Sequence, residues 1–294
     1  MKQAIAFADR LCGEIARHGV TVNARSVLDR SDAMALGRPG FWSPNRSCRL
    51  IAASDGWIAV NLARTDDRDL VPALLERPII GDPWRSIMHD ARSLPTQTLL
   101  HRAMLLGLPA AAVGEADPRL PGPAMSTTGQ RRAVPRVVDL SSLWAGPLCA
   151  SILAQAGAHV VKVESLSRQD TTAISASALD ARLNGAKRRL VLNFRDQAAR
   201  AELRRLVMDA DILVTSARAR AFGALGLARD AVLAANPGLV WVAITGHGWT
   251  TDRVAFGDDA AVAGGLVRRT ADGAPRFMGD ALADPLTGLA AAAA

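Results

Sequence analysis

Hydrophobic residues from position 136 onward follow an alternating pattern. Short runs rich in Val, Ile and Leu are separated by longer segments in which apolar residues recur at helical spacing. We expect strands at 137–140, 160–163, 190–193, 212–215 and 239–245, and helices near 148–156, 196–209, 217–225 and 229–235. This alternation predicts an α/β fold with a Rossmann-like open parallel sheet and helices on both faces.

The first 115 residues show a different pattern. Residues 1–24 place apolar side chains at the spacing of an amphipathic N-terminal helix. Two apolar runs, 49–53 and 57–62, flank Asp55-Gly56, a dipeptide typical of hairpin turns. Helical segments follow at 67–75 and 96–106, so we expect a smaller α+β domain over residues 25–115. A proline-rich linker is predicted at 116–135, followed by the Rossmann-like domain at 136–294.

Composition narrows the class of protein. The chain is 49% hydrophobic and 21% charged, as in globular domains, and it has no run of about 18 apolar residues that would span a membrane. Its net charge of +7 comes from arginines that are scattered along the chain, and aromatic residues make up only 4%, so we do not expect nucleic-acid binding. The three cysteines are far apart and form no metal-binding spacing. They are most simply reduced thiols in a cytoplasmic protein without a bound metal.

The segment 136–164 forms one strand–helix–strand unit. Its first turn, Ser142–Pro147, lies at the carboxyl end of a strand, where open α/β sheets bind ligands. This turn lacks the G-x-G-x-x-G spacing that a nicotinamide-dependent oxidoreductase would need. The turn therefore predicts a ligand site of another kind.

Several short motifs follow this turn in a fixed order. They are Asp139-Leu140-Ser141 with Ala145-Gly146-Pro147, Gly157-Ala158 with Lys162-Val163-Glu164, Asn184 with Lys187-Arg188, Ile244–Gly248, Gly257-Asp258-Asp259, and Asp284-Pro285-Leu286-Thr287-Gly288. Together they resemble the class III CoA-transferase family of the CaiB/BaiF type, which moves coenzyme A between carboxylic acids. Residues 25–115 resemble the second, smaller domain of the same family.

The order of the two parts differs from the family pattern. In the family the β/α segment comes first, whereas here the part that resembles the small domain precedes it. The chain also ends at Ala294, within the helix expected after Asp284. We interpret the sequence as a family member with rearranged domain order and a truncated C-terminus.

The resemblance implies a role for individual residues. It places the catalytic carboxylate at Asp284, which would form an anhydride and then a CoA thioester. An aspartate followed by proline at a helix start is also a common N-cap arrangement, and both roles are compatible. The resemblance further implies a CoA site that includes Leu143, Trp144, Ala145, Gly146, Arg168, Lys187, Arg188 and Ser216.

Three functions remain open at this stage. The first is an acyl-CoA:carboxylate CoA-transferase with acyl-CoA as substrate. The second is an acyl-CoA racemase or carnitine-dehydratase-like enzyme of the same fold, for which His247, Asp258 and Asp259 are weighed as acid–base groups. The third is an inactive truncated relative that serves as a binding or assembly partner. Because family members form interlocked dimers, the resemblance also implies a homodimer or a complementary family subunit.

Overall fold

The computed structural model describes residues 1–117 and 132–294, and it groups them into two compact units. One unit contains residues 35–117 and 246–284, and the other contains residues 2–34, 132–245 and 285–294. The predicted linker at 116–135 lies mostly outside the described residues. The sequence pattern predicts one domain over all of 136–294, whereas residues 246–284 pack with the smaller unit.

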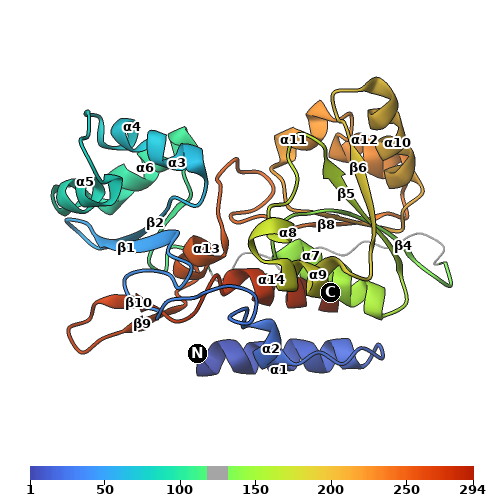
Figure 1. Ribbon diagram of the computed structural model, residues 1–294, viewed down its shortest axis with the longest axis horizontal. Coiled ribbons are helices and arrows are strands. Elements are labelled where there is room, and N and C mark those ends of the chain that lie inside the picture. The colour runs from blue at the N-terminus through green and yellow to red at the C-terminus, as the bar shows by residue number, and fades with distance from the viewer. Residues whose placement is uncertain (118–131) are drawn as a thin grey trace. The chain divides into compact units, whose positions relative to one another are not determined.

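The larger unit is built on a five-stranded sheet in the order β6-β5-β4-β7-β8, in which every pair is parallel. Its strands are β4 (Arg136–Leu140), β5 (His159–Ser165), β6 (Arg188–Leu192), β7 (Ile212–Thr215) and β8 (Val240–Ala243). The helices α10 (Gln197–Met208), α11 (Ala219–Ala224) and α12 (Arg229–Ala235) lie on one face, as Figure 1 shows. The predicted α/β fold with a parallel sheet is confirmed.

The other face of this sheet carries α7 (Ala145–Gln155) and α9 (Ser177–Asn184), with the short α8 (Thr172–Ser175) between β5 and α9. The same unit includes α1 (Lys2–Ala16), α2 (Ala24–Val27) and α14 (Ala283–Ala293) from Pro285 onward. Val137, Cys149 and Val214 belong to the buried core between the sheet and α7. These strands are apolar on both sides because helices cover both faces.

The smaller unit contains an antiparallel sheet in the order β1-β2-β3. Its strands are β1 (Cys48–Ala52), β2 (Trp57–Asn61) and β3 (Ala110–Ala112), and β1 and β2 form the hairpin predicted around Asp55-Gly56. One face is covered by α3 (Thr65–Asp69), α4 (Val71–Leu75), α5 (Pro83–Asp90), the 3-10 turn η1 (Ala91–Ser93) and α6 (Thr96–Leu106). This confirms the smaller α+β part of the predicted fold.

The opposite face of the small sheet explains why residues 246–284 join this unit. Successive residues of a strand point to opposite faces, so Ile51 packs beneath the helices while Leu50 faces the other way. That second face is buried by α13 (Gly257–Ala263) and the hairpin of β9 (Val267–Arg269) and β10 (Pro275–Phe277). Val262 and Phe277 complete a core with Cys48 and Leu50.

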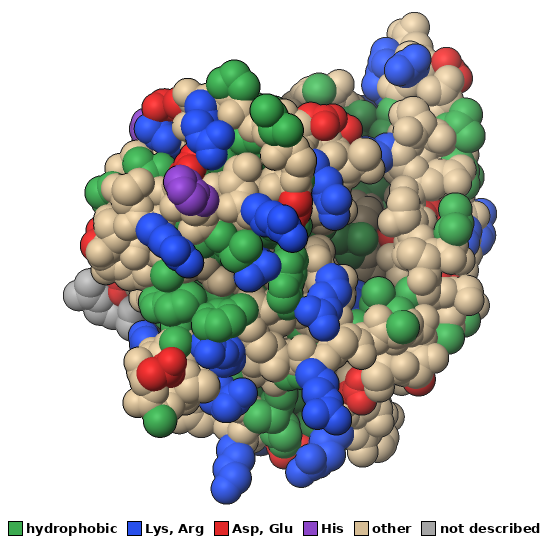
Figure 2. Space-filling model, turned by 60° about the vertical axis from the view of Figure 1, so that its left-hand side comes forward, with side chains coloured by type: hydrophobic (Ala, Val, Ile, Leu, Met, Phe, Trp, Pro, Cys, Tyr) green, Lys and Arg blue, Asp and Glu red, His purple; other side chains and the backbone are tan. Residues whose placement is uncertain are grey.

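The surface shows no gathering of basic groups on the face that Figure 2 presents. Lys and Arg side chains are spread over that face, with hydrophobic, acidic and neutral side chains between them. In the part of the chain that the structure describes, no helix combines the length and apolar character needed to cross a bilayer.

Candidate functional site

The strand order of the parallel sheet reverses at β4 and β7, whose carboxyl ends lie side by side. From β4 the chain continues outward through β5 and β6, and it then returns to the other side of β4 to form β7 and β8. In open α/β sheets, ligands bind at such a reversal of strand order. The two strand ends are joined here by one hydrogen bond, in which Ser142 N donates to Ser216 Oγ over 3.0 Å. Both of these serines are exposed.

The turn between β4 and α7 has a strained backbone at Leu143. Its φ is +68°, in the left-handed region that costs a non-glycine residue about 1–2 kcal/mol. The amide of Leu143 donates to Asp170 Oδ2 over 2.7 Å, which fixes this conformation. The Leu143 side chain is nevertheless 39% exposed. A strained backbone that presents an apolar side chain to solvent is typical of a ligand-binding turn.

A buried group of four charged side chains lies beneath the turn and fixes its backbone. Lys187 Nζ lies 2.8 Å from Asp139 Oδ2, and Lys162 Nζ lies 3.7 Å from Asp170 Oδ2. Lys162 Nζ also donates to Ser141 O over 3.0 Å. Burial would raise the pKa of Asp139, but Lys187 and Lys162 hold it below its usual range. The turn is therefore anchored by ionised groups that solvent cannot screen.

The structure gives Lys187 a different role from the predicted phosphate contact. Its ammonium donates to Asp139, to Pro147 O over 2.8 Å and to Asn184 Oδ1 over 2.9 Å. An ammonium has three N–H donors, and all three are used within a side chain that is fully buried. Lys187 therefore has no N–H donor left to bind a CoA phosphate.

The two arginines of the predicted site lie at different ends of their strands. Arg168 is exposed and follows the carboxyl end of β5, at the same edge of the sheet as Ser142 and Ser216. Arg188 is also exposed, but it begins β6 and so lies toward the amino end of the strand. The fold thus brings Arg168, and not Arg188, to the edge of the sheet where the strand order reverses at the ends of β4 and β7.

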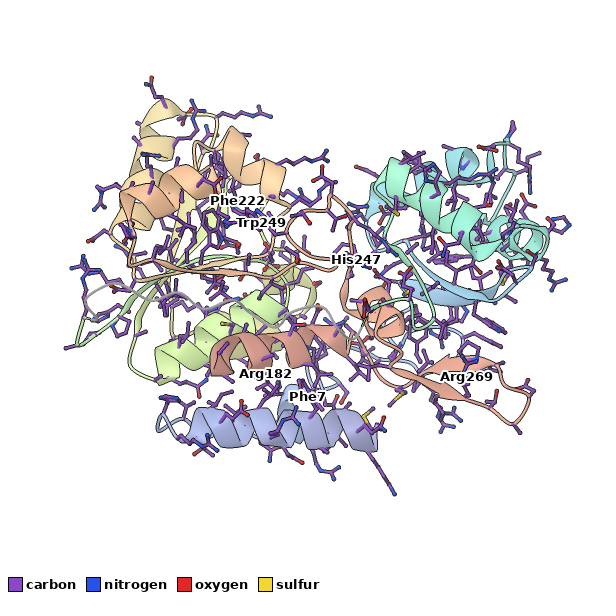
Figure 3. All side chains as sticks on the ribbon, turned by 180° about the vertical axis from the view of Figure 1, so that it is seen from behind. Phe7, Arg182, Phe222, His247, Trp249 and Arg269 are labelled. Atoms are coloured by element: carbon purple, nitrogen blue, oxygen red, sulfur yellow. The ribbon has the colours of Figure 1, made fainter. Side chains whose placement is uncertain are left out.

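Trp144, Ala145 and Gly146 support the turn from within. Trp144 is 1% exposed, and the guanidinium of Arg30 lies 4.7 Å from its ring centroid. Its side chain helps to line a cavity of about 180 Å³ with residues of α7 and α9, among them Arg182, which Figure 3 labels. A Cβ at Gly146 would lie 2.2 Å from Ser141 Oγ, so only glycine fits at this position. At this edge of the sheet, the solvent-facing residues of the predicted site are therefore Leu143, Arg168 and Ser216.

Asp284 lies in the first turn of α14 and is half-buried. Its amide donates to Ala281 O over 2.9 Å. A Cβ at Gly257 would lie 2.7 Å from the Cγ of Asp284, so the carboxyl packs against a position that only glycine can occupy. One turn further along α14, Gly288 leaves room for the carbonyl of Ala145, which a Cβ would approach to 2.6 Å.

Two further titratable groups of the smaller unit have strongly shifted pKa values. Burial, and then the nearby Arg253, lower the pKa of His247 to about 4, so this histidine is neutral at pH 7. Figure 3 labels it on the segment between β8 and α13, and its Nε2 is buried without a hydrogen-bond partner among the residues that the structure describes. Burial, with repulsion from Asp258, raises the pKa of Asp259 to about 7, although Asn61 Nδ2 donates to it over 3.0 Å.

No sequence signal pointed to Asp170, and the sequence suggested Asp258 only as an acid–base group and not as an acceptor for backbone amides. Asp170 follows β5 and accepts from Thr172 N as well as from Leu143 N. Asp258 lies in the first turn of α13 and is 2% exposed. For Asp258 a local signal was present, since acidic residues such as Asp258 and Asp259 are enriched in the first turn of a helix. Within residues 1–117 and 132–294, no three metal-ligating side chains come together.

Comparison with known proteins identifies the family. The model of CoA-transferase family III matches residues 135–294, which is more than half of the chain. The chain belongs to CoA-transferase family III. The matched range contains the whole β4–α7 turn, the buried charges beneath it and Asp284.

Individual members of CoA-transferase family III align with part of this chain. A succinate–glutarate CoA-transferase of Agrobacterium fabrum is 32% identical over 173 residues, covering 52% of this chain and 43% of that protein. An alpha-methylacyl-CoA racemase of Homo sapiens is 36% identical over 113 residues, covering 38% of this chain and 27% of that protein. A CaiB/BaiF family protein of Brucella suis, known as a crystal structure, has 31% identity and a TM-score of 0.49 over 54% of this chain and 46% of its own. The chain thus spans less than half the length of each of these relatives.

Proposed function

We propose that this chain acts in the transfer of CoA from an acyl-CoA to a carboxylic acid, through a covalent intermediate on Asp284. The proposal rests on membership of CoA-transferase family III and on one structural observation. The Asp284 carboxyl lies at the start of a helix, packed against a position that excludes every side chain but glycine. A helix start favours the ionised carboxylate and the negative charge that develops beside it.

The proposed chemistry conserves the energy of the thioester. The carboxylate of Asp284 attacks the thioester carbonyl, a mixed anhydride forms, and CoA leaves as its thiolate. The thiolate then attacks the aspartyl carbonyl, which releases the first carboxylic acid and leaves CoA bound to Asp284 as a thioester. The acceptor carboxylate repeats both steps in reverse and departs as the new acyl-CoA. Because each step exchanges one acyl bond for another, no water is consumed.

The β4–α7 turn supports the same proposal. Within the larger unit, Gly288 of α14 packs against the carbonyl of Ala145, the first residue of α7. In the proposed complex the exposed Leu143 contacts the pantetheine arm, and Ser216 offers its hydroxyl beside it. Arg168 binds phosphate oxygens, a role that suits a guanidinium.

The test is direct detection of the intermediate. The folded chain is incubated with acyl-CoA, trapped with hydroxylamine or borohydride, digested and examined by mass spectrometry, with Asp284→Asn as control. We expect a modification on Asp284 that is absent from the Asn variant. An unmodified Asp284 in a sample that binds CoA, measured by calorimetry, contradicts the proposal.

Racemase or dehydratase chemistry is the second candidate. It is favoured by the raised pKa of Asp259, because a general base works best when its pKa lies near the operating pH. Against it, Asp259 is fully buried and already accepts hydrogen bonds from Asn61 and Phe256. Exchange of solvent deuterium into the α-carbon of an acyl-CoA, with no acceptor acid present, would favour this candidate over transfer.

A further inference from the structure

The segment just before α14 has a strained backbone. Ala281 has a φ of +44°, in the left-handed region, and is 4% exposed. A residue with a Cβ adopts this conformation only where its surroundings hold it. Asp284 N donates to Ala281 O, so the conformation of Ala281 directly affects the start of the helix that carries Asp284.

Asp258 holds Ala281 in this conformation. The amide of Ala281 donates to Asp258 Oδ1 over 2.8 Å. The other carboxylate oxygen, Oδ2, accepts from Asn45 Nδ2 over 2.7 Å. Asp258 therefore connects the strained residue to Asn45, which precedes β1 by three positions.

The orientation of the Asn45 amide is fixed by its other contacts. Its Oδ1 accepts from Ser47 N over 2.8 Å and from Ser43 Oγ over 2.9 Å, so its Nδ2 must point toward Asp258. In addition, Asn45 N donates to Asp280 Oδ1 over 3.2 Å, beside Ala281. The side-chain amide of Asn45 therefore cannot be flipped, so Asn45 is the donor and Asp258 is the acceptor in their hydrogen bond.

The residue before Asp258 completes the arrangement. A Cβ at Gly257 would lie 2.6 Å from Ala281 O and 2.8 Å from Asp284 Oδ2. Gly257 thus bounds the space in which the Asp284 carboxyl can move, while Asp258 fixes the backbone that leads to it. All of these residues belong to the smaller unit.

We propose that Asp258 and Asn45 form a positioning pair for Asp284. They do not touch the substrate but act through the backbone of Ala281, and they set the direction from which the Asp284 carboxylate approaches the thioester. This inference rests on the proposed function of Asp284. It assigns Asp258 a role other than that of an acid–base catalyst.

The experiment exchanges the two polar groups. Asp258→Asn leaves one oxygen for two donors, Asn45 Nδ2 and Ala281 N, so one of these hydrogen bonds is lost. Asn45→Asp places two carboxylates face to face. The double variant restores a donor opposite an acceptor and keeps the net charge. Asp272→Asn, which removes an exposed carboxylate in the same unit, is the control for loss of charge.

Three quantities are measured in each variant: the rate of Asp284 modification by acyl-CoA, the affinity for CoA, and hydrogen exchange at the Ala281 amide. We expect both single variants to slow modification by about tenfold or more, since small displacements of a reacting group have large effects on rate. Affinity for CoA should stay unchanged and exchange at Ala281 should accelerate. The double variant should recover both the rate of Asp284 modification and the protection of the Ala281 amide from exchange. Asp272→Asn should match the wild type in all three measurements.

Three outcomes overturn the positioning role. Folded single variants could modify Asp284 at the wild-type rate, the double variant could protect Ala281 without recovering the rate, or both single variants could leave Ala281 protected. If the single variants do not fold, recovery in the double variant alone decides the question. If wild-type Asp284 is never modified although CoA binds, the proposed function fails, and exchange at Ala281 then tests the contact by itself.

Discussion

Because α14 lies very close to α7, the geometry at Gly288 determines whether Gly288→Ala stabilises or destabilises the protein. Gly288 lies within α14, where alanine would gain about 1 kcal/mol in helix propensity over glycine. A Cβ there would, however, lie 2.6 Å from Ala145 O and 3.0 Å from Leu148 Cβ. Neither atom is the end of a flexible side chain, so the helices must separate, and such overpacking costs about 1–3 kcal/mol. We expect Gly288→Ala to destabilise the larger unit despite its better helix propensity.

Gly223 is the matched control. It also lies within a helix, α11, but a Cβ there would meet nothing within 4 Å. Gly223→Ala should therefore stabilise the protein by about 1 kcal/mol, from helix propensity alone. Scanning calorimetry of both variants tests the difference, since 1 kcal/mol shifts Tm by about 2–4 °C in a unit of this size. If Gly288→Ala raises Tm as much as Gly223→Ala, the inferred contact between α14 and Ala145 is wrong.

Three further predictions concern charged groups. Lys187→Met removes the ammonium that pairs with the buried Asp139, so it should lower the free energy of unfolding in urea by about 3–5 kcal/mol. Arg188 is exposed, so Arg188→Met should lower it by about 0.5 kcal/mol or less. Equal losses in the two variants would refute the structural role of Lys187. Since burial raises the pKa of Asp259 to about 7, the stability that depends on its proton is complete below pH 3.8 and is lost as pH rises toward and through 7. Asp259→Asn should therefore gain in Tm relative to wild type between pH 4 and pH 8, and a difference that does not vary with pH would contradict this. Arg168→Ala should weaken CoA binding about tenfold in calorimetry with Tm unchanged, and an unchanged Kd would remove Arg168 from the proposed site.

The regular elements were predictable where the local pattern was strong. All five strands of the parallel sheet were expected within a few residues, because each contains a short run of apolar residues bounded by segments of helical pattern. The segment 246–284 was assigned to the other domain because its partners, Cys48 and Leu50, lie some 200 positions away in the sequence. No periodicity within a segment identifies the distant surface on which it packs.

The candidate site was predictable as a turn but not as a set of contacts. The motif Ala145-Gly146 identified the turn, and its position at the end of a strand suggested a ligand site. Whether a basic residue faces solvent or a buried carboxylate cannot be determined from its identity, and Lys187 is the example. Likewise, the roles of Asp170 and Asp258 depend on backbone amides of Leu143 and Ala281, which any sequence would possess.

The core that Val262 and Phe277 share with Leu50 has a consequence for the order of folding. During synthesis, the helices α3–α6 and the hairpin of β1 and β2 can associate as soon as residue 112 has been made, because their contacts are local. The reverse side of that hairpin stays uncovered until more than 150 further residues have left the ribosome. At the usual pace of translation this interval lasts about 10–30 s, during which an apolar sheet face is open to chaperones and to aggregation.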